Sequence, residues 1–156
     1  MLRWSFLISI AFILGCKPSK QIANDNYLLF SIEKGPCFGT CPEYKVEVYS
    51  SGEAHFNGIR NVEHVGEFQT KLPAESIKEI ADSIDALNIA ALDSNYVNKF
   101  LTDFPATDLG FEIKGVKKRI HIFHESPPQE IQKVMDVINT FENRINWGFS
   151  TQTKQH

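Results

Sequence analysis

The sequence predicts an α+β domain in which an antiparallel sheet, made of a four-stranded meander plus a hairpin, packs against two helices in two layers. Three observations lead to this fold class: apolar and polar residues alternate in short segments, turn residues separate those segments, and two longer segments carry apolar residues at helical spacing. The expected order of elements is ββββαββα, which is typical of a two-layer α+β domain.

The alternating segments define the expected strands. They are 28–34, 44–49, 54–57, 62–68, 109–113 and 119–123, of which the last two form a hairpin around Gly115. In 44–49, Tyr44, Val46 and Val48 share one face of the strand. Lys45 and Glu47 share the other face. We therefore expect a sheet that is covered by other elements on one side only.

Two helices are expected to cover that side of the sheet. The first is predicted over 73–88, where apolar residues recur at helical spacing and Pro73 stands in the first turn. At the start of the second helix, Ser126 and Gln129 have the spacing of a capping box. An apolar stripe then continues as far as Ile145.

The N-terminal segment has the layout of a bacterial lipoprotein signal peptide. Arg3 supplies a positive charge, and 5–14 is uncharged and apolar but too short for a permanent membrane-spanning helix. The ILGC sequence at 13–16 resembles a lipobox, which places cleavage before Cys16 and lipid on its sulfur. The alternative is a buried cysteine that happens to follow an apolar run. Stable membrane anchorage needs more than one acyl chain, and bacterial lipidation, as the resemblance implies, provides three.

The expected organisation of the chain follows from this anchor. The successive parts are a removed signal peptide (1–15), a lipidated N-terminus and tether (16–26), a single α+β domain (27–148) and a flexible tail (149–156). Because Lys17 is not the aspartate associated with inner-membrane retention, we expect the outer membrane, with the domain facing the periplasm.

The net charge of the chain is −3 and becomes −4 once Arg3 is removed with the signal peptide. No basic run appears, so nucleic acid is not an expected partner, whereas the membrane is reached through the lipid.

A cysteine-containing motif carries a resemblance to a known family. The segment 36–44 reads PCFGTCPEY, and Asp93, Tyr96, the TDFP run at 102–105 and Trp147 follow it in the remainder of the chain. This pattern resembles a family of secreted bacterial domains of unknown function that share a PCFGTCPxY motif, over residues 27–147. The resemblance implies a fold and a location outside the cytoplasm. It implies no activity, substrate or cofactor, so no catalytic residue is assigned.

Cys37 and Cys41 are the remaining cysteines once Cys16 carries lipid. Four residues of extended chain separate Cα atoms by about 13 Å, whereas a disulfide needs roughly 4.4 to 6.8 Å, so the chain must turn between the two cysteines if they bond. Gly39 provides a permissive residue in the middle. We expect a structural disulfide. A redox pair or a metal site remains the alternative, although zinc usually takes four ligands and no second cysteine pair is present.

The long connection over 93–107 is the candidate binding loop, with Tyr96, Thr102, Asp103 and Pro105 as its candidate residues. The alternative is structural, with the aromatic residues closing one end of the core and Thr102 and Asp103 bonding to nearby backbone.

Two classes of function remain open. The first is a non-catalytic binding or interaction domain for a protein, glycan or lipid. The second is a small periplasmic, hydrolase-like enzyme that uses the 93–107 loop. The sequence contains no GxSxG elbow, glycine-rich phosphate loop or HExxH motif, and we expect no catalytic residue, metal or cofactor. The histidines, including His121 and His124, are expected to be exposed side chains.

Overall fold

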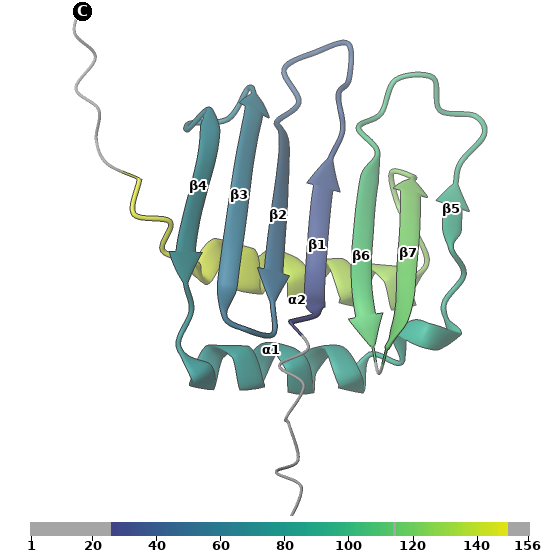
Figure 1. The fold of residues 1–156 in the computed structure, drawn as a ribbon. Coiled ribbons are helices and arrows are strands. Elements are labelled where there is room, and N and C mark those ends of the chain that lie inside the picture. The colour runs from purple at the N-terminus through teal and green to yellow at the C-terminus, as the bar shows by residue number, and fades with distance from the viewer. Residues whose placement is uncertain (1–25, 114, 150–156) are drawn as a thin grey trace, which may run out of the picture.

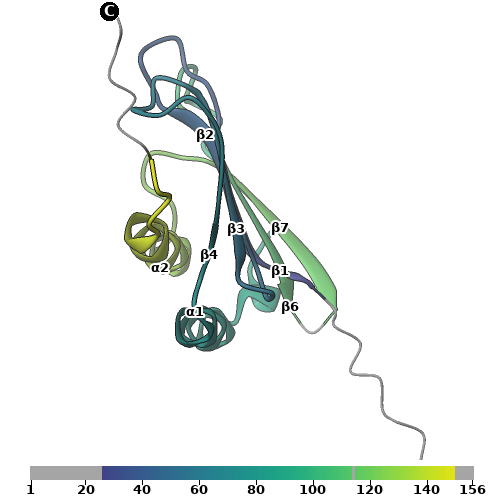
Figure 2. The same cartoon turned by 60° about the vertical axis from the view of Figure 1, so that its left-hand side comes forward.

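The computed structural model describes residues 26–113 and 115–149 and has an α+β fold. A seven-stranded sheet is covered on one face by two helices, which lie side by side (Figures 1 and 2). The elements, in chain order, are β1 (Leu28–Lys34), β2 (Glu43–Tyr49), β3 (Glu53–Arg60), β4 (Gly66–Lys71), α1 (Ala74–Ala86), the short 3-10 helix η1 (Ile89–Ala91), β5 (Asn95–Val97), β6 (Thr107–Ile113), β7 (Val116–Phe123) and α2 (Gln129–Arg144).

The strand order across the sheet is β4-β3-β2-β1-β6-β7-β5. The predicted meander and hairpin are therefore both present, and β1 joins them by pairing with β2 on one side and β6 on the other. All of these pairs are antiparallel. The central position of β1 makes the meander and the hairpin a single sheet with one continuous covered face.

The sheet is mixed, however, because β5 pairs in parallel with the edge strand of the hairpin, β7. The sequence predicted an entirely antiparallel sheet and placed Asn95–Val97 in a long connection, so the prediction is wrong at this edge. A strand of three residues shows no measurable alternation of apolar and polar side chains. Only the neighbouring β7, with Tyr96 opposite Ile122, makes it a strand.

The third strand was expected to end at residue 57, but β3 continues through Gly58 to Arg60, and β4 begins at Gly66 rather than at residue 62. Gly58 is needed for close packing here rather than for a turn, because a Cβ at this position would lie 2.1 Å from the carbonyl oxygen of His64. The turn lies further along the chain, where Asn61 and Gly66 have positive φ angles of 55° and 122°.

Both predicted helices form on the expected face, but neither has a side-chain cap. The N-cap residues are Pro73 for α1 and Pro128 for α2. The capping box predicted from Ser126 and Gln129 is absent, since Gln129 is already the first helical residue and the backbone N–H of Ser126 donates instead to Nδ1 of His124. The two prolines nevertheless suit the start of a helix, where an N–H group has no helical partner.

The core lies between the sheet and the helices. Phe30, Ile32 and Val46 on the sheet are completely buried, and Ile80 and Ile138 face them from α1 and α2. This agrees with the predicted one-sided cover. Of the helices that the structure describes, none is long and apolar enough to cross a membrane. The predicted signal peptide, lipobox and most of the tether, at 1–25, lie outside the described residues.

Candidate binding surface at the loop end

Two connections meet at one end of the sheet. Segment 35–42 links β1 to β2, and segment 98–106 links β5 to β6; both lie at the upper end of the sheet in Figure 1. We call these two segments together the loop end. The chain enters β1 at Leu28, at the opposite end of the sheet.

Segment 35–42 is braced by its two cysteines. The sulfurs of Cys37 and Cys41 lie at disulfide-bonding distance, with Cα atoms 5.8 Å apart, which agrees with the disulfide interpretation of the motif. The backbone N–H of Gly39 points at Sγ of Cys37, 3.3 Å away. The side-chain amide of Asn61 donates to the carbonyl oxygen of Cys41 over 3.0 Å and so ties this loop to the turn after β3. The segment is therefore held in one compact turn.

Asp103 connects the two segments of the loop end. Its Oδ1 accepts a hydrogen bond of 2.9 Å from the backbone N–H of Phe38, across 65 residues of sequence. A second link is formed where the N–H of Gly35 donates to the carbonyl oxygen of Ala106 over 2.8 Å. The two loops are thus one structural unit.

The loop end exposes two phenylalanines almost completely. Phe38 is 92% exposed and Phe100 is 94% exposed, and Val97, at the end of β5 three residues before Phe100, is 45% exposed. Phe100 is held outward by a turn in which Oδ1 of Asn98 accepts from the Phe100 N–H over 3.0 Å. The amide of Asn98 donates to both carboxylate oxygens of Glu125, and this bond is the largest cause of the lowered pKa of that carboxyl group. The exposed side chains are therefore carried by ordered loops.

The residues predicted for the binding loop divide between two roles. Asp103 lies in segment 98–106 and its contact is with backbone, but with the distant Phe38 N–H rather than with the nearby backbone that the structural alternative expected. Tyr96 faces the covered side, packs against the core and accepts a hydrogen bond at its hydroxyl from the Asp93 N–H. Thr102 is exposed and Pro105 is half-buried within the same connection. The structure does not bring these four residues together as one site.

The sequence reasoning did not single out Phe38, and its structural alternative counted Phe100 among the loop aromatics that close one end of the core, whereas the structure exposes this ring. Phe38 lies between Cys37 and Gly39, within a five-residue turn bounded by the two cysteines, and its ring is exposed there. Phe100 lies outside any periodic pattern. In both cases the available signal was an apolar residue in a segment that no strand or helix could bury.

A cluster of ionisable side chains lies beneath the loop end, on the covered face. Burial raises the pKa of the Glu142 carboxyl group, which accepts from the Tyr44 hydroxyl, and it lowers the pKa of the nearby Lys34 ammonium group. Burial and the neighbouring Glu142 likewise raise the pKa of Tyr44. These groups join α2 to the ends of β1 and β2, so they belong to the support of the loop end.

The histidines contribute no metal site in the part of the chain that the structure describes, where no three histidine, cysteine or acidic side chains cluster suitably. His121 lies on the uncovered face of the sheet, with Nδ1 at 2.9 Å from Oδ1 of Asp108. His124, just beyond the end of β7, accepts the Ser126 N–H. The two rings are therefore in separate environments.

A comparison with known protein families identifies the family of this domain. Residues 28–142 match the family described as a domain of unknown function, DUF6438. Because the match covers most of the chain, the protein belongs to this family. No curated protein matches the chain significantly by sequence. The matched segment begins with β1 and ends within α2, and thus includes the whole sheet and both segments of the loop end.

Proposed function

We propose that this DUF6438 protein is a lipid-anchored protein of the cell envelope that binds another protein, without catalysis, through Phe38 and Phe100. The observation that carries the proposal is the near-complete exposure of both rings on two loops that are bonded to each other. Large aromatic side chains dominate the energetics of protein interfaces, and exposed apolar groups that the fold does not need mark such surfaces.

The braced geometry of the loop end favours binding. A loop that is ordered before it meets a partner loses less conformational entropy on association. The cysteine pair, the Asp103 contact and the Asn98 turn order the two phenylalanine-bearing segments in advance. The enzyme alternative would require Asp103 to act on a substrate, whereas one of its oxygens already accepts the Phe38 N–H.

The position of the proposed anchor also favours a partner located away from the anchoring bilayer. β1 begins at the end of the sheet opposite the loop end. A flexible tether of about ten residues spans roughly 15 to 20 Å on average. With lipid on Cys16, the start of β1 stays near the membrane and the loop end can point away from it, toward the periplasm if the outer membrane is the site of anchorage.

The anchor is tested separately from the binding surface. Cys16→Ser should abolish labelling by a fatty-acid probe and should leave an uncut precursor or a soluble species in fractionated cells. Undiminished label on this variant would contradict the lipid anchor and leave the loop-end proposal standing.

The binding surface is tested by photo-crosslinking in living cells. A photoreactive amino acid placed at position 38 or 100 should give the same discrete adduct with one envelope protein, and the same residue at Lys133, exposed on α2, should not. Purified acylated protein should then bind that partner, and Phe38→Ser with Phe100→Ser should abolish the binding. Identical adducts from all three positions, binding that survives the double substitution, or adducts with glycan alone would overturn the proposal of a protein partner.

A further inference from the structure

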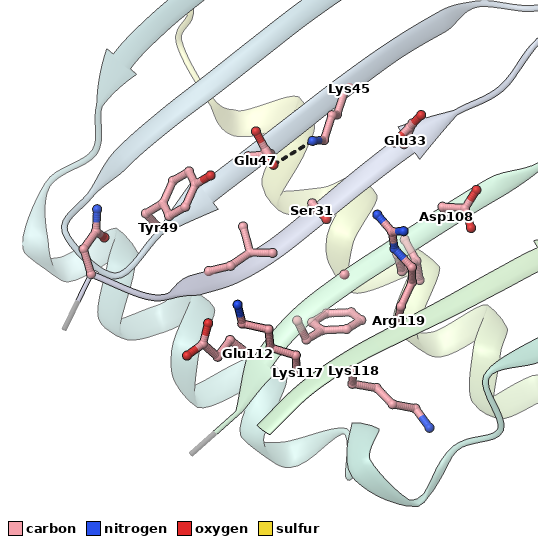
Figure 3. Close-up of a pocket in the computed structure, with 15 residues that line it drawn as sticks. Ser31, Glu33, Lys45, Glu47, Tyr49, Asp108, Glu112, Lys117, Lys118 and Arg119 are labelled. Atoms are coloured by element: carbon pink, nitrogen blue, oxygen red, sulfur yellow. Dashed lines mark ion pairs between the residues drawn. The ribbon is translucent and has the colours of Figure 1, made fainter. Parts of the chain in front are cut away.

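The face of the sheet opposite the helices contains a groove that is separate from the loop end. Its volume is about 510 Å³. Side chains from β1, β2, β6 and β7 line it, and it extends toward the end of the sheet where the chain enters β1 (Figure 3). Most of its labelled side chains are charged or polar, which distinguishes this surface from the apolar loop end.

The floor of the groove is formed by a position without a side chain. Ser31 on β1 is paired with Gly110 on β6, and Gly110 is paired with Arg119 on β7. A Cβ at Gly110 would lie 2.4 Å from Oγ of Ser31, closer than real atoms approach. The glycine therefore allows Ser31 to lean over β6, where its hydroxyl group occupies the place that a side chain at position 110 would take.

The charges around this floor are only partly compensated. Lys45 and Glu47 form an ion pair of 2.8 Å, and Asp108 pairs with His121 at 2.9 Å. In contrast, Arg119 and Glu33 form no ion pair or side-chain hydrogen bond with any residue that the structure describes, and both are exposed. Lys117 and Glu112 line the same groove and also form no ion pair with any described residue, so Arg119 and Glu33 are one cation and one anion among four unpaired charges there.

The spacing of these two charges suggests a ligand length. Arg119 and Glu33 are two strands apart across the sheet and two residues apart along it, because Ser31 and Glu33 are separated by one position on the same face. Neighbouring strands lie about 4.8 Å apart and residues rise about 3.4 Å, which separates the two Cα atoms by roughly 12 Å. An extended tripeptide spans roughly 10 Å. The length of such a peptide is therefore comparable to the separation of the two Cα atoms.

We propose that the groove binds a short peptide with free termini, whose carboxylate pairs with Arg119 and whose ammonium group pairs with Glu33. The planar guanidinium group suits a carboxylate because it can donate two parallel hydrogen bonds. Ser31 supplies a hydroxyl group between the two charges, toward the peptide backbone. This site is independent of the loop end and of any partner bound there.

The proposal is tested by ligand-observed NMR titration of the purified acylated protein in detergent micelles. Three probes are compared: trialanine, trialanine amide, which lacks the carboxylate, and N-acetyl-trialanine, which lacks the ammonium group. Trialanine should bind saturably, and each blocked form should bind about tenfold more weakly, as expected for loss of one charge-assisted contact.

Substitutions test which residue binds each terminus of the peptide. Arg119→Ala should weaken trialanine binding about tenfold and leave the affinity for trialanine amide unchanged, because that probe already lacks the interacting group. Glu33→Gln should weaken trialanine binding to a similar degree and leave N-acetyl-trialanine unaffected. Lys133→Ala, on the opposite side of the molecule, is the control and should change nothing.

Absence of saturable trialanine binding, equal affinities for all three probes, or unchanged affinity in both groove variants would overturn the proposal. Thermal unfolding of each variant, expected to match that of the parent protein because both side chains are exposed, excludes loss of fold as the cause of weak binding.

Discussion

Two phenylalanines show how differently the covered face and the loop end are built. Phe30, on β1, is completely buried between the sheet and the helices, whereas Phe38, eight positions later, is 92% exposed. Burial of a phenylalanine side chain contributes about 1.5 to 3 kcal/mol to folding, so the first ring stabilises the fold and the second does not. The loop end instead depends on one covalent bond and a few hydrogen bonds.

This difference separates the residues that maintain the fold from those available for binding. Apolar burial acts cooperatively across the covered face, where the inward apolar side chains Phe30, Ile32, Val46 and Val48 of the central strands are completely buried. The contacts at the loop end are individual, and each orders only the segments that it joins. Substitutions in the two regions should therefore differ in size, and four predictions test that expectation.

The largest effect is expected for the matched pair Phe30→Ala and Phe38→Ala. The first leaves a cavity in the core and should lower the free energy of unfolding by about 3 to 5 kcal/mol. The second removes an exposed ring and should change it by less than about 0.5 kcal/mol. Urea unfolding monitored by circular dichroism measures both, and similar losses in the two variants would contradict the division between core and loop end.

Cys37→Ser combined with Cys41→Ser should have a smaller effect. A loop of five residues closed by a disulfide contributes roughly 2 kcal/mol in the chain-entropy model, so the domain should still fold but segment 35–42 should be cut faster by protease. Mass spectrometry of the non-reduced protein should find no alkylatable thiol at either position. Two free thiols in protein taken from the envelope would reopen the redox and metal interpretations.

Asp103→Ala should lower the free energy of unfolding by about 0.5 to 2 kcal/mol, because the Phe38 N–H loses its acceptor. Asp103→Asn keeps an oxygen at the same place and should lose less. Hydrogen exchange at the Phe38 amide measures the contact directly and should accelerate more in the alanine variant. Unchanged stability together with loss of partner binding in either variant would favour a direct binding role for Asp103.

The smallest effects on stability are expected from changes in pH. Glu142 on α2 and Glu79 on α1 should change the stability in opposite directions as pH rises. The raised pKa of Glu142 means that the folded state holds its proton more tightly, so the stability from this group is present at low pH and is lost as pH rises through its raised pKa. The pKa of Glu79 is lowered by its hydrogen bond from Arg144, so its contribution is present above the ordinary carboxyl pKa and is lost as pH falls through the lowered value.

Urea unfolding across the acidic range, up to neutrality, compares Glu142→Gln with Glu79→Gln. The Glu142 variant should lose the component of stability that declines with rising pH, and the Glu79 variant should lose the component that declines with falling pH. Changes of the same sign in both variants would contradict the assigned burial of Glu142.

Much of the covered face was predictable because burial acts on short, regular patterns. The strand predicted over 28–34 agrees with β1, and the alternation of Tyr44, Val46 and Val48 correctly identified the side covered by the helices. The candidate site was less predictable. Of its predicted residues, Thr102, Asp103 and Pro105 lie in segment 98–106. Tyr96 faces the core, because a loop without periodicity does not indicate where its side chains point.

The sequence by itself determined the α+β class and the one-sided cover of the sheet, and it singled out Cys37 and Cys41 as a candidate disulfide pair, since each of these depends on residue types a few positions apart. Only the tertiary structure decided that β5 is a strand parallel to β7, that Asp103 joins two loops across 65 residues, and that Arg119 and Glu33 border one groove. These features depend on strand order across the sheet. Strand order follows from the packing of the whole chain, and no local pattern of residues records it.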